Sequence, residues 1–239
     1  MQKLLKAFEL LKRPRLAKAA ATHRVAAAVE HLPAIQLSRA NTLIDAGANK
    51  GQFSLAFRSL RPSARIIAFE PLATAADIFE KLFANDTLTS LQRVALADAD
   101  QFADFHITDR DDSSSLLKPC SGQRRAFGVR EATVTTVPLR RLSDCVDFRS
   151  LSHPILLKVD VQGSELGVFG GCDQLAEIDF IYAELSFVEL YKHQPLYDEV
   201  AAFLVDKGFR SAGVFNQVTT PAFGPTQADI LFRRHQDGS

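Results

Sequence analysis

Apolar runs of strand length alternate with apolar residues at helical spacing along most of the chain. A buried strand reads as a continuous apolar run, whereas a helix packed on a sheet repeats its apolar side chains every three or four residues. Strand-like runs occur at 41–47 (NTLIDAG), 64–71 (ARIIAFEP), 91–96 (LQRVAL), 154–160 (PILLKVD), 180–187 (FIYAELSF), 209–215 (FRSAGVF) and 228–234 (ADILFRR). Helical stripes fall at 53–60, 78–82, 163–175 and 197–204. This alternation predicts an α/β fold with an open, mostly parallel sheet, closed by an antiparallel pair formed by the last two strands.

Two segments depart from this alternation. Residues 97–137 are rich in Asp, Ser and Thr and are predicted to form a hairpin and loops. Near the start of the chain, Pro14 separates one amphipathic helical stretch from a second one with Val25, Val29 and Leu32 on one face. We therefore expect a helical appendage over 1–38 and a single domain over 39–239.

Charge adds detail to the appendage and excludes one class of partner. The 28 Lys and Arg balance the 28 Asp and Glu, so no basic surplus supports a nucleic-acid partner. The first 24 residues nevertheless hold seven Lys or Arg against the single acid Glu9. Such a segment suits either a helix packed on its own domain or peripheral contact with an anionic membrane. With no apolar run of membrane-spanning length and no signal-peptide pattern, a cytoplasmic protein is expected.

Four predicted strands each end on an acid, namely Asp45, Glu70, Asp160 and Glu184. An acid just past a strand commonly caps the following helix, so each alone carries little information. In an open α/β sheet, however, ligands bind outside the carboxyl ends of the strands. Four acids at that edge together indicate a ligand site.

The first of these strand ends continues into the loop Asp45-Ala-Gly-Ala-Asn-Lys-Gly51, which predicts a sharp turn and close approach of a ligand to the backbone. Glu70 follows one strand–helix–strand unit later, where an acid binds the hydroxyls of an adenosine ribose. The loop lacks the middle glycine of G-x-G-x-x-G, which disfavours NAD, and it lacks the ending of an ATP-binding P-loop. An acid ahead of the glycines suits the amino group or sulfonium of S-adenosylmethionine.

Several motifs recur in order over residues 40–215: IDAGANKGQFSLAFR, IIAFEPL, SSSL, LLKVDVQGSELGVFGG and AELSFVELYKHQPLYDEVAAFLVDKGF. This set resembles the FkbM family of S-adenosylmethionine-dependent methyltransferases. The resemblance implies a seven-stranded Rossmann-like class I fold and methylation of a hydroxyl on a sugar, glycan or related natural product. It also implies a set of cofactor contacts: Asp45, Gly47, Asn49, Gly51 and Phe53 around the methionine moiety, Glu70 at the ribose, Pro71 and Leu72 at the adenine, and Ala95, Ser114, Ser115 and Asp160 as further contacts.

Transfer of a methyl group to a hydroxyl needs alignment, exclusion of water and a base. Asp160 stands at a strand end where a base or a substrate anchor is expected, and Glu184 and His193 are the other catalytic candidates. Glu165, in the first turn of the following helix, could also face the cleft, or it could instead be an acid at the helix N-terminus that interacts with the helix dipole. Lys158, inside a buried-looking strand, is expected to pair with Glu184 or Asp160.

Asp160 and Glu184 could share a divalent metal, because hard cations prefer carboxylate oxygens, but the spacing does not demand one and no metal is expected. Cys120, Cys145 and Cys172 are predicted to be reduced and structural. Two alternatives to a methyltransferase stay open at this point: another enzyme with an adenosine cofactor, and a partner subunit that keeps the fold without turnover. The acceptor and the oligomeric state have no signature in the sequence.

Overall fold

The computed structural model describes Leu16 and residues 21–235. In chain order its elements are η1 (Val29–His31), α3 (Leu32–Ser38), β1 (Thr42–Ala46), α4 (Gln52–Leu60), β2 (Arg65–Phe69), α5 (Ala73–Phe83), β3 (Thr89–Gln92), β4 (Ala95–Leu96), β5 (Gln101–Thr108), η2 (Asp111–Ser113), α6 (Ser121–Phe127), β6 (Glu131–Arg140), α7 (Leu142–Cys145), η3 (Phe148–Ser150), β7 (Ile155–Val159), α8 (Glu165–Gly170), η4 (Leu175–Glu177), β8 (Phe180–Ser186), α9 (Tyr197–Asp206), β9 (Phe209–Thr220) and β10 (Gly224–Arg234).

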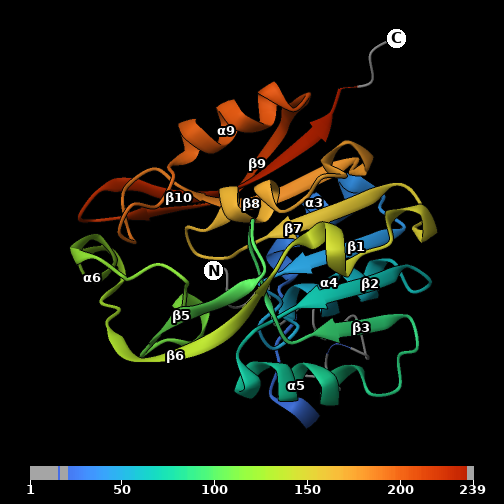
Figure 1. The fold of residues 1–239 in the computed structure, drawn as a ribbon, viewed down its shortest axis with the longest axis horizontal. Helices are drawn as coiled ribbons and strands as arrows, with labels where there is room; N and C mark the ends of the chain where they lie inside the picture. Colours follow the sequence, from blue (N-terminus) through green and yellow to red (C-terminus); the bar gives the residue numbers. More distant parts are fainter. Residues whose placement is uncertain (1–15, 17–20, 236–239) are drawn as a thin grey trace.

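Seven strands form the central sheet in the order β3-β2-β1-β7-β8-β10-β9 (Figure 1). Neighbours pair in parallel from β3 to β8, whereas β10 is antiparallel to both β8 and β9. Only β10 therefore runs against the others, inserted before the edge strand. This confirms the predicted Rossmann-like class I sheet with its antiparallel closing strand.

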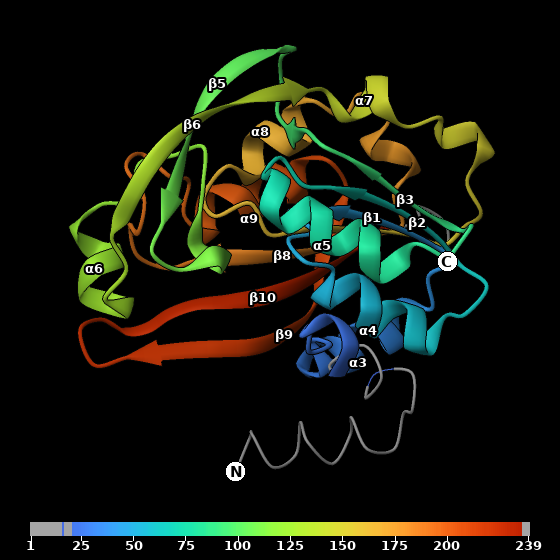
Figure 2. The same ribbon diagram turned by 90° about the horizontal axis from the view of Figure 1, so that it is seen from below.

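Helices cover both faces of the sheet, as expected for strands that are apolar throughout. On one face, side chains of α3, α4 and α5 pack with Leu43, Ile66 and Leu231. On the other face, α7, α8 and α9 pack with Ile44, Leu157 and other strand residues. The two helical layers are seen from the side in Figure 2.

The predicted third strand is split. Residues 89–92 pair with β2 in the main sheet, but Ala95 and Leu96 pair with Leu139 and Arg140 of β6 in a second, three-stranded sheet. That small sheet has its own apolar core around Phe105, Val137 and Leu139. The β5–β6 hairpin so formed stands on the side of the main sheet toward which β1 and β2 point (Figure 1).

The start of the described chain differs from the predicted helix over Val25–Leu32. Residues 24–28 are not helical, Arg24 has a φ of 55°, and the Ala28 amide donates to the Gln52 carbonyl at the start of α4 (3.1 Å). Val25 and Val29 are buried in the same cluster as α3 and α4. Most of the basic stretch lies outside the described residues, and within the described part no helix is long and apolar enough to cross a membrane.

Candidate active site

A cavity of about 320 Å³ opens at the carboxyl ends of β1, β2 and β7. Its walls come from the segment 26–31, the loop after β1, the end of β2, the segment 94–96, the hairpin, and the turn after β7. This volume is in the range of sites for small molecules. Of the four strand-end acids, Glu70 and Asp160 are among the described residues that line this cavity, whereas Asp45 and Glu184 are not.

The loop after β1 makes the predicted tight turn, and its glycines are needed mainly for packing. Gly47 has a φ of +74°, and a Cβ there would overlap the carbonyl oxygen of Asp160. Gly51 has a φ of +89°, and a Cβ there would lie 2.9 Å from the Phe83 ring of α5. Gly47 lines the cavity, whereas Gly51 lies behind it. The close approach that the glycines allow is therefore to β7 and α5.

Glu70 lies at the end of β2 with its side chain fixed by backbone amides. Its Oε2 accepts from the Asn49 amide (2.9 Å) and its Oε1 from the Leu72 amide (2.9 Å). Burial raises the pKa of Glu70, although these two amides act in the opposite direction. The carboxylate lines the cavity beside Pro71 and Leu72. Each oxygen keeps a lone pair for a ligand hydroxyl, which fits the predicted ribose contact.

Asp45, in contrast, is not among the described residues that line the cavity. It is fully buried, accepts from Ser54 Oγ (2.6 Å), and lies 3.1 Å from the ammonium of Lys158. Lys158 also donates to the Gly47 carbonyl (2.7 Å) and lies 3.7 Å from Asp160. Burial alone would lower the pKa of Lys158, but Asp45 and Asp160 raise it above its ordinary value. Asp45 thus holds a buried cation in place, where the sequence had suggested a contact with the methionine moiety.

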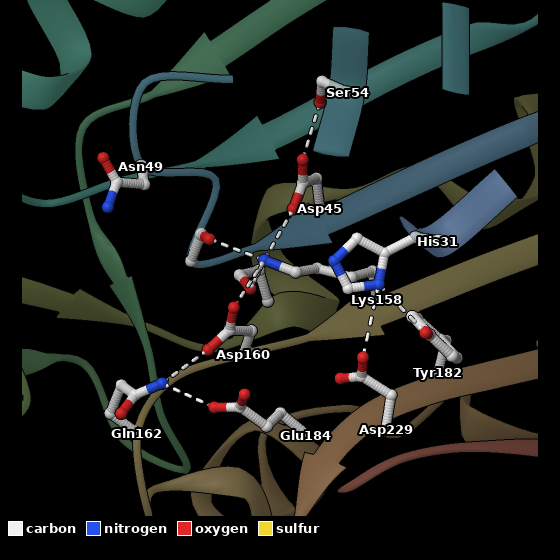
Figure 3. A network of polar contacts seen from close by, with 12 residues as sticks. His31, Asp45, Asn49, Ser54, Lys158, Asp160, Gln162, Tyr182, Glu184 and Asp229 are labelled. Carbon is white, nitrogen blue, oxygen red and sulfur yellow. Dashed lines mark hydrogen bonds and ion pairs between the residues drawn. The ribbon is translucent and has the colours of Figure 1, made fainter. Parts of the chain in front are cut away.

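Asp160 faces the cavity from the turn after β7, with its side chain 40% exposed. The amide of Gln162 donates both to Asp160 (2.8 Å) and to Glu184 of β8 (2.7 Å), so that it bridges the two carboxylates (Figure 3). Gln162 is held in turn by Tyr191, whose hydroxyl donates to its carbonyl oxygen (2.9 Å). Burial and the nearby Asp160 raise the pKa of Glu184 well above its usual range.

The other predicted residues divide between the cavity and its surroundings. Asn49, Phe53, Ala95 and Ser114 line the cavity. Ser115 is buried behind it and donates to the Gln162 carbonyl (2.7 Å). His193 is exposed in the loop after β8, outside the cavity, and its amide donates to Glu189.

Sequence reasoning missed one wall and several side chains of the cavity. The segment 26–31 lines it, including His31, although it was assigned to the appendage. Phe105 and Leu116 of the hairpin, with Lys158 and Gln162, complete the apolar and polar walls. Gln162 lies within the motif LLKVDVQGSELGVFGG, although the sequence assigned it no role, and no local pattern marks His31. Within the described ranges no group of three or more His, Cys, Asp or Glu could hold a metal ion.

Comparisons with known proteins agree with this architecture. Residues 45–211 match the family model described as "Methyltransferase FkbM domain". The chain is 32% identical over 160 residues to the 2-O-methyltransferase NoeI of Sinorhizobium fredii, a match that covers 64% of this chain and 66% of NoeI. It is 29% identical over 221 residues to the methyltransferase sdnD of Sordaria araneosa, covering 82% of each.

A solved structure supports the fold. The crystal structure of TehB from Haemophilus influenzae superposes with a TM-score of 0.51 at 8% identity, over 92% of this chain and 67% of TehB. A match at this low identity shows a shared fold alone. The strand order, the cavity at the strand ends and the family match over most of the chain lead to one conclusion: this chain belongs to the FkbM methyltransferase family, whose cofactor is S-adenosylmethionine.

Proposed function

We propose that the protein transfers the methyl group of S-adenosylmethionine to a hydroxyl oxygen of a sugar, a glycan or a related natural product. The observation that carries the proposal is the arrangement of Glu70 and Asp160 on the walls of one cavity. Glu70 is the acid expected for a ribose, and Asp160 is a half-exposed carboxylate that can accept from an acceptor hydroxyl. The name of NoeI, a 2-O-methyltransferase, supports oxygen as the methylated atom.

The residues at the β2 end of the cavity suit an adenosyl group. Glu70 would hold the ribose hydroxyls, and the apolar side chains of Leu72, Leu96 and Phe105 would contact the base. Gly47 and Asn49 also line the cavity, and they would contact the methionine part of the cofactor. When bound, S-adenosylmethionine supplies an electrophilic methyl group on a sulfonium.

The residues at the β7 end suit a hydroxylated acceptor. Asp160 and Gln162 both line the cavity, and together they offer carboxylate and amide groups to neighbouring hydroxyls. Gln162 fixes Asp160 through its bridge to Glu184. We propose Asp160 as the anchor that aligns the acceptor oxygen, which is a large part of catalysis in a reaction between two bound molecules.

The hairpin and the segment 26–31 complete the cavity, and we propose that they select the acceptor. Asp112, Ser114 and Leu116 come from the hairpin region, and Ala26 and Glu30 from the other side. Binding surfaces of this kind vary with loops placed on a common fold. The oligomeric state and any contact of the basic N-terminal stretch with a membrane stay predictions.

Two measurements test the proposal. Calorimetric titration with S-adenosylmethionine and S-adenosylhomocysteine, with NADH and ATP as controls, should show binding of the two sulfur compounds alone. Transfer of a labelled methyl group should then be measured to methyl glycosides of hexoses and 6-deoxyhexoses, followed by location of the methyl group in the product by NMR. Cofactor binding combined with methylation of amines or carboxylates in place of hydroxyls would contradict the proposed acceptor class.

A further inference from the structure

A histidine with a carboxylate behind it lies on the wall of the cavity. His31 lines the cavity from the end of η1, and its side chain is 20% exposed. Asp229 of β10 lies behind it, with a side chain that is 10% exposed. The two residues are 198 positions apart in sequence, so only the fold brings them together.

All the polar contacts of the His31 ring with the described residues involve one nitrogen, Nδ1. Nδ1 lies 3.0 Å from the Tyr182 hydroxyl, 3.3 Å from Asp229 Oδ2 and 3.1 Å from the amide nitrogen of Asn216. Figure 3 shows the dashed lines leaving this nitrogen, while the other ring nitrogen points away from Asp229. Within Leu16 and 21–235 no polar contact engages Nε2.

Nδ1 faces two groups that can accept a hydrogen, the Asp229 carboxylate and the Tyr182 hydroxyl. The third group near it, the Asn216 amide, only donates, but its two hydrogens have other acceptors, Asp229 Oδ2 and the Tyr182 hydroxyl (3.3 Å), so neither is needed at Nδ1. An ionised carboxylate accepts hydrogen bonds only, so a hydrogen shared between His31 and Asp229 belongs to Nδ1. The amide of Asn216 donates to the same Oδ2 (2.8 Å), which leaves that carboxylate oxygen as the common acceptor. A neutral imidazole with Nδ1 protonated has a lone pair on Nε2.

Aromatic packing fixes the plane of the His31 ring. Its centroid lies 5.3 Å from that of Phe53 and 5.6 Å from that of Tyr182, the latter in an edge arrangement. Phe53 itself lines the cavity and stacks on Tyr182 at 5.8 Å. An imidazole held on two sides keeps its free nitrogen in a fixed direction, as a general base requires.

The other candidate for a base, Asp160, has a donor or a cation near each oxygen, although each oxygen keeps a further lone pair that can anchor a hydroxyl. Its Oδ1 accepts from Gln162 (2.8 Å), and its Oδ2 lies 3.7 Å from the Lys158 ammonium. His31 has a free nitrogen, whereas Asp160 has contacts that hold its orientation. The two residues therefore suit different tasks in the same cavity.

We propose that His31 is the residue that accepts the proton of the acceptor hydroxyl, and that Asp229 positions it. The inference rests on the proposed O-methylation. As the hydroxyl oxygen bonds to the methyl carbon, the carbon–sulfur bond breaks with its electron pair going to sulfur, and the hydroxyl proton goes to His31 Nε2. The positive charge that leaves the sulfonium is thus replaced by an imidazolium, which Asp229 stabilises.

The first test reads the proton position without needing an acceptor. In the full-length protein saturated with S-adenosylhomocysteine at pH 8, long-range ¹H–¹⁵N NMR spectra resolve the two ring nitrogens of its six histidines. The His31 signals, assigned by their loss in His31→Gln, should show a proton on Nδ1 and a pyridine-like Nε2. Asp229→Asn should reduce that preference. A proton on Nε2 in the unsubstituted protein would overturn the proposal.

The second test separates a chemical role from a structural one. With methyl glycosides as acceptors, His31→Gln should lower kcat by roughly 10²–10⁴-fold, the usual contribution of a general base, while affinity for S-adenosylhomocysteine is retained. Asp229→Asn should give a smaller loss of kcat together with its NMR change. His153→Gln is the matched control, because His153 also pairs with an aspartate, Asp179 (2.7 Å), but lies outside the cavity.

The outcomes distinguish this inference from the proposed function. An unchanged kcat in His31→Gln would show that His31 is not the base, even if the protein is an O-methyltransferase. If the unsubstituted protein methylates no glycoside, the sugar acceptor is wrong, and the NMR result alone then decides the assignment of His31.

Discussion

The two ends of the cavity are built in different ways. At the cofactor end, Glu70 is held by the backbone amides of Asn49 and Leu72, all within one strand–helix–strand unit. At the acceptor end, Gln162 joins Asp160 of the β7 turn to Glu184 of β8 through side chains. His31 and Asp229 are brought together there from opposite ends of the described chain.

With the cofactor and the acceptor bound as proposed, this difference would allow one fold to keep its cofactor and change its acceptor. A site made by backbone amides tolerates changes in surrounding side chains, because the amides stay when the sequence changes. A site made by side chains on many elements depends on each of them. We therefore expect substitutions at the acceptor end to affect turnover, and those at the cofactor end to affect binding.

The largest expected effect is on turnover at the acceptor end. Asp160→Asn keeps the shape of the side chain but removes the charge that binds the acceptor hydroxyl. We expect kcat/KM for a methylated glycoside to fall by roughly 10²–10⁴-fold, with calorimetric affinity for S-adenosylmethionine unchanged. Asp104→Asn, which changes an exposed carboxylate of β5 that does not line the cavity, is the control. Normal turnover in Asp160→Asn would remove Asp160 from the site.

A backbone substitution tests the contact that joins the two ends. Gly47→Ala places a Cβ against the Asp160 carbonyl and also forces alanine into a φ of +74°. Gly128→Ala is the matched control, because Gly128 has the same φ of +74° but a Cβ there would have no neighbouring atom within 4 Å. We expect Gly128→Ala to cost about 1 kcal/mol and Gly47→Ala about 1–3 kcal/mol more, measured by denaturant unfolding. Equal costs would mean that the loop can move away from β7.

A smaller effect is expected on cofactor affinity. Glu70→Ala removes the expected ribose contact and leaves the Asn49 and Leu72 amides without their acceptor. Calorimetry should show affinity for S-adenosylhomocysteine reduced by about ten- to a hundredfold, the worth of one or two hydrogen bonds to a charged group. Glu80→Ala, on the exposed side of α5 and paired with Arg93, provides the control. A loss of turnover without a loss of affinity would place Glu70 at the wrong end of the cavity.

The same contrast explains what the sequence could predict. The apolar runs predicted β1, β2 and β7 most directly because these strands are buried along nearly their whole length, and Glu70 followed from its distance to the glycine loop. Asp45 occupies an equivalent place at a strand end. The sequence could not show that Lys158, 113 residues later in the chain, would lie beside it on the neighbouring strand β7 and pair with its carboxylate. A motif therefore predicts where a residue lies in the fold, whereas long-range packing determines which groups its side chain contacts.

His31 and the split third strand show the other limit. Val25, Val29 and Leu32 repeat at helical spacing, yet residues 24–28 are not helical. Instead, the Ala28 backbone amide donates a hydrogen bond to the Gln52 carbonyl at the start of α4. Similarly, LQRVAL reads as one strand, but pairing with β6 draws its second half into another sheet. In both places a distant partner overrides a local pattern, and both places form walls of the cavity.

The smallest expected effect concerns a buried acid under the acceptor end. Glu165, the first residue of α8, is 3% exposed and accepts from the Gly163 amide in the turn that carries Asp160 and Gln162 (2.8 Å). Burial raises the pKa of Glu165 to about 7 from its ordinary value of 4.5. The folded state therefore holds this proton more strongly than the unfolded state, so its contribution to the free energy of unfolding falls as the pH rises through that window.

Glu165→Gln should remove that part of the pH dependence while keeping an oxygen for the Gly163 amide. Because burial also raises the pKa of Glu70, the unsubstituted protein should lose stability from both residues as the pH rises above 4.5, with the Glu165 contribution lost by about pH 7. The free energy of unfolding of the two proteins should be measured by urea unfolding across this pH range. The difference between their changes with pH reports Glu165 alone and should amount to about 1–3 kcal/mol. Parallel profiles would show that Glu165 stays ionised when buried, and the turn would then need a cation or a solvent path that balances its charge.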